Sequence, residues 1–206
     1  EEIAREHLPE NIGVEWSGLS YQEKQAGGKT GLVLSLVFLF VFLFLAALYE
    51  SWTVPVAVLL SLPVAALGAY LGEWMCGLEN DIYFQIGLVM LMGMAAKNAI
   101  LIVEFAKEQT DKGDDAYEAA LFASKLRFRP ILMTSLAFIL GMLPMVIASG
   151  PGSASRQAIG TGVFFGMIFA VVFGILLVPF FFVIVYRSVA KFKVIRRGIK
   201  LPSFKK

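Results

Sequence analysis

Long runs of apolar residues dominate the chain and alternate with shorter polar segments. Five runs are long enough to cross a membrane as helices, since a spanning helix needs roughly 17–25 apolar residues. They cover residues 31–49, 54–72, 82–103, 131–147 and 159–186. Strands of a membrane β-barrel would instead show about ten residues of alternating polarity, a pattern these runs lack. The pattern predicts an all-α polytopic membrane protein with five transmembrane helices.

Composition agrees with the pattern of runs. Hydrophobic residues make up 58% of the chain, against roughly 45–50% in soluble domains. A water-soluble protein of this size has too little interior to hide so much apolar surface. This excludes an ordinary soluble enzyme or binding domain.

Basic residues indicate how the helices are oriented. They gather in the loop 106–129 and in the tail 188–206, while the connection 73–81 has none. The positive-inside rule therefore places the loop and the C-terminus in the cytoplasm, and five spans place residues 1–30 on the opposite side. A basic tail can also bind nucleic acid, but next to a membrane we expect it to contact anionic lipid.

The polar N-terminal segment, 1–30, reads as the end of a soluble domain. A helix that Pro9 ends occupies 1–10, and the alternation in 11–18 predicts a half-buried strand. A lone strand needs partners, and the sequence contains none. We therefore expect a short α+β remnant of a larger domain. Gly27 and Gly28 precede the first span and predict a hinge.

Two further segments predict helix contacts. Residues 114–128 suit an amphipathic helix lying on the cytoplasmic membrane face, and Pro130 then opens the fourth span. Gly162 and Gly166 form a Gly-x-x-x-Gly pair, which favours close helix packing. Gly160 and Gly174 extend this smooth surface.

Lys97 is the only charged residue within the run 82–103. A lysine near the centre of a spanning helix costs about 2.5–3.5 kcal/mol on insertion, so it normally has a partner and a role. Small residues surround it, and Asn98 beside it also needs hydrogen bonds. No predicted span contains a carboxylate, and Glu104 lies about 10 Å away along the helix. Lys97 therefore needs an acid from elsewhere or sits neutral; the alternative is that it snorkels to the interface.

Thr134 and Ser135 are the hydroxyl residues of the fourth span that lie near its cytoplasmic end. Thr134 suits a polar contact inside the bundle. Alternatively, its hydroxyl bonds only to its own helix, at the carbonyl of Pro130. The sequence leaves both alternatives open.

No metal or cofactor site is indicated. Cys76 and His7 are each the single residue of their type, so no thiol or imidazole cluster is present. Four methionines have soft thioethers that suit soft cations, although methionine usually fills gaps between helices. These are Met90, Met92, Met94 and Met133.

Several motifs carry a family resemblance. The longest read GMAAKNAILIVEFAKE at 93–108 and RFRPILMTSLAF at 127–138. Shorter ones are LYESW at 48–52, NDIYFQ at 80–85 and GTG at 160–162. Taken in their order along the chain, these motifs resemble the C-terminal membrane region of resistance-nodulation-division (RND) efflux pumps. The resemblance is strongest to the hydrophobe/amphiphile branch of the AcrB type.

The resemblance implies an architecture and a role for the chain. The five spans correspond to the last five of a twelve-helix bundle, and residues 1–30 to the end of the periplasmic porter domain. Such pumps are trimeric drug/proton antiporters of the Gram-negative inner membrane. They export amphiphilic drugs, dyes or detergents together with a periplasmic adaptor and an outer-membrane channel.

The same resemblance implies the site residues. Lys97 matches a lysine that pairs with two intramembrane aspartates, and these aspartates belong to a segment absent from this sequence. Asn98, Thr134 and Arg127 match the neighbouring asparagine, the relay threonine and an arginine at the cytoplasmic mouth. This agrees with the missing partner of Lys97. The alternatives are a heavy-metal RND exporter and a non-transporting membrane scaffold or assembly factor.

Overall fold

The computed structural model describes residues 17–18, 21, 30–52 and 54–197. Within these ranges the regular elements are helices, and no strand occurs. The helices are α3 (Thr30–Tyr49), α4 (Val54–Leu59), α5 (Leu62–Cys76), α6 (Ile82–Asp111), α7 (Ala116–Val146) and α8 (Ser153–Arg197).

The prediction of five membrane-spanning helices is confirmed for the described part of the chain. The five segments that are long and apolar enough to cross a membrane are Gly31–Tyr49, Val54–Cys76, Ile82–Asp111, Ala116–Val146 and Ser153–Val189. The predicted helix 1–10 lies outside the described residues, as does the predicted strand apart from its residues 17 and 18, which are not in a strand. The α+β remnant therefore stays a prediction.

The second predicted span, 54–72, is interrupted near its middle, where α4 ends and α5 begins. Pro63 has no amide hydrogen to donate to the carbonyl of Leu59, four residues earlier, so the helix ladder breaks there. The hydroxyl of Ser61 donates a 2.6 Å hydrogen bond to the carbonyl of Val58 instead. This bond is buried and satisfies one of the carbonyls at the end of α4.

The structure also differs from the sequence prediction in α7. We expected a separate amphipathic helix at 114–128 and a new span beginning at Pro130, but both belong to one continuous helix. Pro130 removes a single backbone hydrogen bond. Packing offsets that loss, because Ala119 and Ala123 are fully buried. One side of this segment packs against the bundle, while Tyr117, Leu121 and Phe122 are exposed. Its position on the cytoplasmic membrane face stays a prediction.

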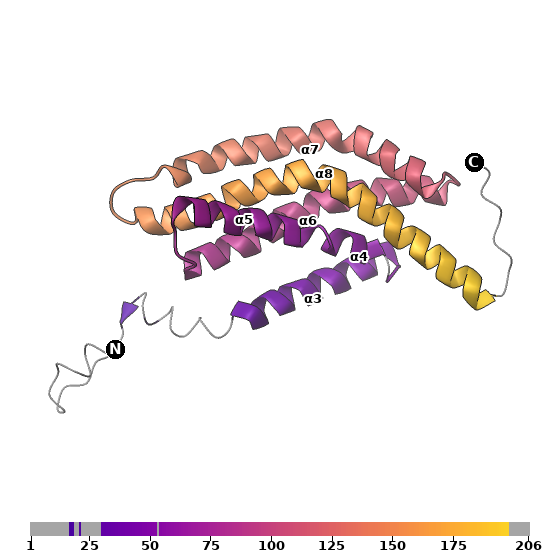
Figure 1. Ribbon diagram of the computed structural model, residues 1–206, viewed down its shortest axis with the longest axis horizontal. Coiled ribbons are helices and arrows are strands. Elements are labelled where there is room, and N and C mark those ends of the chain that lie inside the picture. The colour runs from indigo at the N-terminus through magenta and orange to yellow at the C-terminus, as the bar shows by residue number, and fades with distance from the viewer. Residues whose placement is uncertain (1–16, 19–20, 22–29, 53, 198–206) are drawn as a thin grey trace, which may run out of the picture.

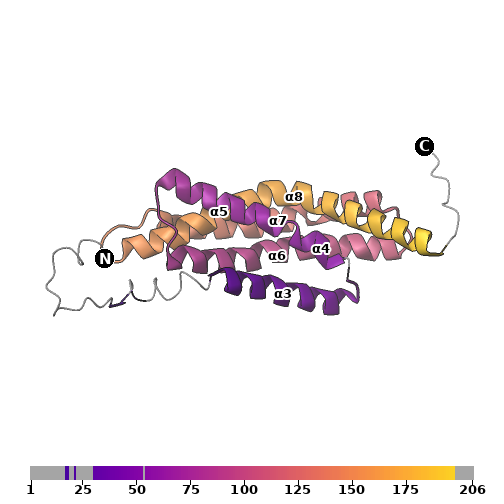
Figure 2. The same ribbon diagram turned by 60° about the horizontal axis from the view of Figure 1, so that its bottom comes forward.

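α8 is the helix around which the others are arranged. It packs along α5, α6 and α7, and Figures 1 and 2 show it running through the bundle between α5 and α7. α3 lies at the edge of the bundle in both views, next to α4. Within 31–49, only Leu45 and Tyr49 of α3 are buried.

The core consists of two clusters of buried apolar side chains. The first includes Leu45, Val58, Val103, Ile131 and Phe182. The second includes Leu62, Phe84, Leu91, Val163 and Met167. Both clusters draw on α6 and α8, so these two helices form the common core that positions everything else.

Glycines let the helices approach α8 closely, as the Gly-x-x-x-Gly pair predicted. A Cβ added at Gly162 would lie 2.7 Å from the ring of Phe84, and one added at Gly166 would overlap the side chain of Leu91. Real Cβ atoms do not come so near, so both positions require a residue without a side chain. Gly174 differs from the prediction, since no atom lies within 4 Å of a Cβ placed there.

The closest helix approach gives a stability prediction. A Cβ at Gly160 would lie 2.9 Å from the backbone of Met145 and of Val146, and backbone atoms cannot rotate away as a side chain can. We expect Gly160→Ala to lower the free energy of unfolding by about 1–3 kcal/mol, the usual cost of overpacking. Gly174→Ala, in the same helix, should be neutral or raise it by up to about 1 kcal/mol.

Chemical unfolding of the purified protein in detergent micelles measures both variants. Equal unfolding midpoints for Gly160→Ala and Gly174→Ala would show that α7 and α8 are not packed as closely as described.

Candidate functional site

Lys97 lies on a face of α6 that the other described helices leave uncovered. Its side chain is exposed, and Met90, Gly93 and Glu104 on the same face of the helix are exposed residues too. None of the described residues forms a hydrogen bond or ion pair with Lys97. That Lys97 pairs with an acid from elsewhere stays a prediction.

The small residues around Lys97 divide between two faces of α6. Ala95, Ala96 and Ala99 are buried against the bundle, as the sequence predicted. Gly93 lies on the uncovered face, and no atom lies within 4 Å of a Cβ placed there. The uncovered face around Lys97 is therefore shallow and smooth, which leaves room for another helix to approach the ammonium group.

Asn98 connects α6 to α7 beside the lysine. Its amide nitrogen Nδ2 donates a 3.1 Å hydrogen bond to the hydroxyl Oγ of Ser135, and Ser135 is only 2% exposed. Within a membrane each such bond contributes about 0.6 kcal/mol on average. The bond fixes the rotation of α6 and α7 relative to each other. Lys97 precedes Asn98 in the chain and Thr134 precedes Ser135, so the bond also fixes the positions of Lys97 and Thr134.

The hydroxyl of Thr134 bonds within its own helix, which is one of the two alternatives that the sequence left open. Its hydroxyl donates to the carbonyls of Pro130 at 3.0 Å and Ile131 at 3.1 Å, both in its own helix. The side chain is nevertheless exposed. The hydroxyl oxygen therefore keeps its lone pairs available to a donor that approaches from outside the described helices.

Arg127 lies one turn before Pro130, and its guanidinium contacts α6. The guanidinium carbon Cζ lies 3.8 Å from the centre of the Phe105 ring, a cation–π contact. Its Nε atom is buried and has no hydrogen-bond partner among the described residues. A buried donor without an acceptor is costly, so this nitrogen is available to an acceptor from another segment.

Two of the predicted site residues and one unexpected residue complete the description. Gly27 and Gly28, the predicted hinge, lie outside the described residues.

The expectation that no span contains a carboxylate was wrong. Glu73 lies within the candidate span Val54–Cys76 and is 3% exposed, with no hydrogen-bond partner for its Oε1 among the described residues. The prediction failed because α5 extends one turn beyond the apolar run.

The methionines do not gather into a thioether site. Met92 is 5% exposed and belongs to the core, whereas Met90 and Met133 are 44% and 69% exposed. In the described residues, no group of three or more His, Cys, Asp or Glu side chains is placed to hold a metal ion. The helix packing thus explains Met92 as a gap filler.

Comparison with known proteins identifies the family. The sequence profile of the AcrB/AcrD/AcrF family matches residues 1–186, nearly the whole chain. The chain belongs to the AcrB/AcrD/AcrF family. This confirms the resemblance to RND efflux transporters that the motifs around Lys97 and Thr134 indicated.

Individual members of the AcrB/AcrD/AcrF family are closely similar. The chain is 55% identical over 185 residues to the toluene efflux pump membrane transporter TtgB of Pseudomonas putida. The matched segment covers 90% of the chain and 18% of TtgB. The chain is 51% identical over 187 residues to the multidrug resistance protein MdtF of Escherichia coli, with the same coverage. The multidrug export protein AcrF of Escherichia coli is 49% identical over 181 residues, or 87% of the chain and 18% of AcrF. The chain therefore spans about a fifth of the length of these relatives.

Proposed function

We propose that the chain forms part of a proton-driven antiporter that exports amphiphilic drugs, dyes or detergents, and that it carries the lysine side of an intramembrane proton relay. Family membership supports the transporter class, since relatives are named for efflux of toluene and of several drugs. The position of Lys97 supports the coupling to protons.

The uncovered, unpaired Lys97 is the observation that carries this proposal. An ammonium group on the surface of a membrane helix is stable only next to a carboxylate or water. The described helices supply no carboxylate to it. In the proposed relay, two aspartates of a further segment of the pump face Lys97 across the smooth surface around Gly93.

Protonation of those aspartates drives the proposed cycle. Two neighbouring carboxylates cannot both stay ionised cheaply, so one of them binds a proton near the working pH. Lys97 stabilises the ionised state by pairing with it. When a proton binds, the pairing weakens and Lys97 is released, which shifts a helix packing that has two stable arrangements.

The neighbours of Lys97 have supporting roles in this proposal. Asn98, bonded to Ser135, keeps the backbone of Lys97 in place while its side chain changes partner. Thr134 accepts a hydrogen bond from the moving ammonium or from a water that carries the proton. Arg127, held against Phe105, presents its free Nε at the entrance of the relay on the cytoplasmic side.

The proposed assembly follows from the same family. We expect a homotrimer in the Gram-negative inner membrane, with the N-terminal segment in the periplasm and the C-terminus in the cytoplasm, as the basic residues indicate. A periplasmic adaptor and an outer-membrane channel complete the export path. The heavy-metal alternative has less support, because Met92 packs in the core while Met90 and Met133 are exposed.

Substitutions at Thr134 test the relay separately from helix stability. We expect Thr134→Val, which keeps the shape and removes the hydroxyl, to lower drug efflux about tenfold, the effect of losing one hydrogen bond worth about 1.4 kcal/mol. Thr134→Ser should keep most of the activity. The measurement is efflux of a fluorescent dye from cells, normalised to the amount of pump in the membrane.

Thr110→Val is the matched control for this experiment. The Thr110 hydroxyl also donates to a carbonyl four residues earlier, that of Ala106, at 2.8 Å, but it lies outside the site. If Thr134→Val and Thr110→Val reduce efflux equally, the hydroxyl of Thr134 acts only within its own helix and the relay assignment is wrong.

A further inference from the structure

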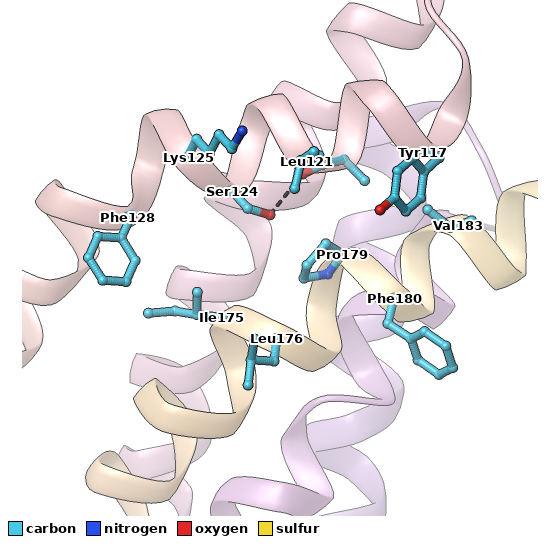
Figure 3. Close-up of a pocket in the computed structure, with 11 residues that line it drawn as sticks. Tyr117, Leu121, Ser124, Lys125, Phe128, Ile175, Leu176, Pro179, Phe180 and Val183 are labelled. Atoms are coloured by element: carbon cyan, nitrogen blue, oxygen red, sulfur yellow. Dashed lines mark hydrogen bonds between the residues drawn. The ribbon is translucent and has the colours of Figure 1, made fainter.

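A groove lies between α7 and α8, away from Lys97. It has a volume of about 400 Å³, within the usual range for ligand sites of about 300–1,000 Å³. Leu121, Lys125 and Phe128 of α7 and Leu176, Pro179 and Phe180 of α8 are among the residues that line it. Figure 3 shows these side chains on the two facing helices, with Pro179 at the middle of the groove. We refer to it as the α7–α8 groove.

Pro179 explains why the helices separate here. A proline inside a helix cannot donate to the carbonyl four residues earlier, that of Ile175, and its ring pushes against that carbonyl. α8 therefore bends, and Figure 1 shows its C-terminal half turning away from α7. The bend leaves Leu176 and Phe180 68% and 57% exposed at the wall of the groove.

The apolar walls of the groove lie at membrane depth. The part on α8, around Leu176 and Phe180, falls within the uncharged run 159–186. Apolar surface at this depth is covered by lipid chains or by other helices. The groove therefore accepts a hydrocarbon chain along its length.

The α7 side of the α7–α8 groove carries a positive charge, between Leu121 and Phe128 (Figure 3). Lys125 is the only charged residue that lines it, and no described residue forms an ion pair or hydrogen bond with Lys125. Arg129 follows one turn later on α7, which places a second cation beside the first. Lys125 precedes the apolar run at Ile131 by about 9 Å of helix, which is the depth of lipid head groups.

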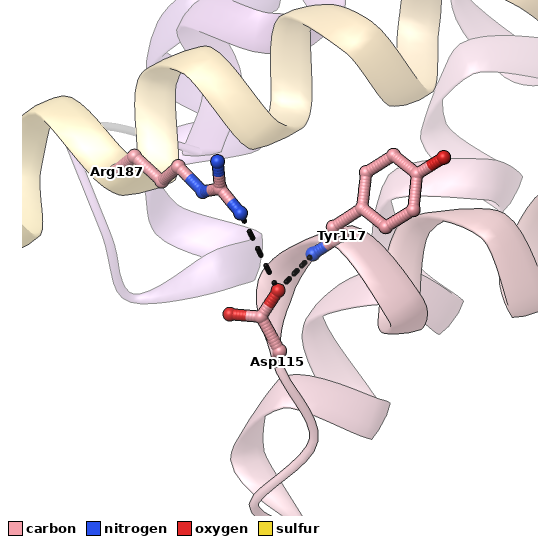
Figure 4. A network of polar contacts seen from close by, with 3 residues as sticks. All are labelled: Asp115, Tyr117 and Arg187. Atoms are coloured by element: carbon pink, nitrogen blue, oxygen red, sulfur yellow. Dashed lines mark hydrogen bonds and ion pairs between the residues drawn. The ribbon is translucent and has the colours of Figure 1, made fainter. Parts of the chain in front are cut away.

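The acids at the start of α7 do not pair with Lys125. Glu118 forms no ion pair with it, and Asp115 has other partners. Asp115 accepts a 3.2 Å hydrogen bond from the backbone amide of Tyr117, and its Oδ2 lies 3.5 Å from Nη2 of Arg187 (Figure 4). These contacts join the start of α7 to the end of α8. They close the end of the groove near Tyr117 and leave Lys125 free to bind an anion.

We propose that the α7–α8 groove binds one anionic phospholipid from the cytoplasmic leaflet. The phosphate of the lipid lies against Lys125, with Arg129 beside it, and one acyl chain fills the space over Leu176 and Pro179. A cation at the rim of the groove and apolar walls beside it match a molecule with one anionic head and a hydrocarbon tail. This site is separate from the proposed relay.

Lipid titrations of the purified protein test the site. Native mass spectrometry in detergent would count bound phosphatidylglycerol and phosphatidylcholine with identical acyl chains. We expect one phosphatidylglycerol to be retained more tightly than phosphatidylcholine. Lys125→Gln should weaken phosphatidylglycerol binding about fivefold, the contribution of one basic residue near an anionic surface, and leave phosphatidylcholine binding unchanged. Leu176→Trp, which fills the groove, should weaken both.

Matched controls lie outside the groove. Lys112→Gln removes an exposed cation that pairs with Glu108 at 2.7 Å, and Leu140→Trp enlarges another exposed side chain of α7. Neither should change lipid binding. Equal retention of the two lipids, or equal effects of Lys125→Gln and Lys112→Gln, would overturn the proposal.

A photo-crosslinking residue at Phe180 gives an independent result in intact membranes. A lipid adduct at Phe180 supports the site, and Lys125→Gln should reduce its yield. An adduct with protein and none with lipid would show that a helix covers the groove, and would overturn the proposal.

Discussion

Lys97→Ala should reduce drug efflux by the complete transporter to the level of membranes that lack it. In the proposed relay Lys97 is the only cation that the described helices present to the acidic partner, so no other side chain replaces it. The amount of protein in the membrane should stay the same or rise, since the substitution removes an insertion cost of about 2.5–3.5 kcal/mol. Dye efflux and proton flux, both measured in proteoliposomes, should be lost together.

Lys112→Ala is the control for this result. Lys112 is exposed and pairs with Glu108 four residues earlier in the chain, so its loss should leave transport intact. Full dye efflux by a stably inserted Lys97→Ala transporter would refute the relay. Loss of efflux together with loss of the protein from the membrane would instead assign Lys97 to folding.

The membrane helices could be predicted from the sequence because the apolar runs determine them directly. Each predicted run lies on helix in the structure, apart from the break between α4 and α5 and the final residue of the run 131–147. Polar segments next to the runs were harder to predict. The helix of α7 continues through 116–129 because Ala119 and Ala123 pack against the bundle, and the sequence contains no information on which neighbour covers a small residue.

Lys97 could be singled out from the sequence, because a single charge in an apolar run is recognised without knowledge of packing. The contacts around it could not. Ser135 as the partner of Asn98, and Phe105 as the partner of Arg127, depend on how α6 and α7 are rotated about their axes. The hydrophobic pattern leaves that rotation undetermined, because apolar residues lie on all sides of the membrane-spanning parts of both helices.

Two further contacts show the same limit. The Nζ of Lys107 donates a 2.7 Å hydrogen bond to the carbonyl of Tyr49 at the end of α3, and the Tyr49 hydroxyl donates to the carbonyl of Ile100 at 3.2 Å. The sequence indicates Lys107 only as one of the basic residues of the loop 106–129 and gives no partner for Tyr49. Their pairing holds α3, which has few buried residues, against α6.

The chain alone should show no proton-coupled transport. The nearest carboxylate to Lys97 in its own helix is Glu104, about 10 Å away along the axis, which is beyond the reach of a hydrogen bond. A relay with only its basic side cannot bind and release a proton at Lys97 in exchange for drug. Proteoliposomes that contain only these 206 residues should therefore give no proton flux when a drug gradient is applied.

The matched preparation contains the complete transporter with the same lipid and the same amount of protein, and should give a flux that Lys97→Ala abolishes. Correct insertion of the chain alone is checked by circular dichroism, which should show the helical content of α3 to α8. Drug-driven proton flux from the chain alone would mean that Lys97 finds its acid within the 206 residues. Because Glu104 is the nearest carboxylate in the helix of Lys97, Glu104→Gln would then be the variant that tests that acid.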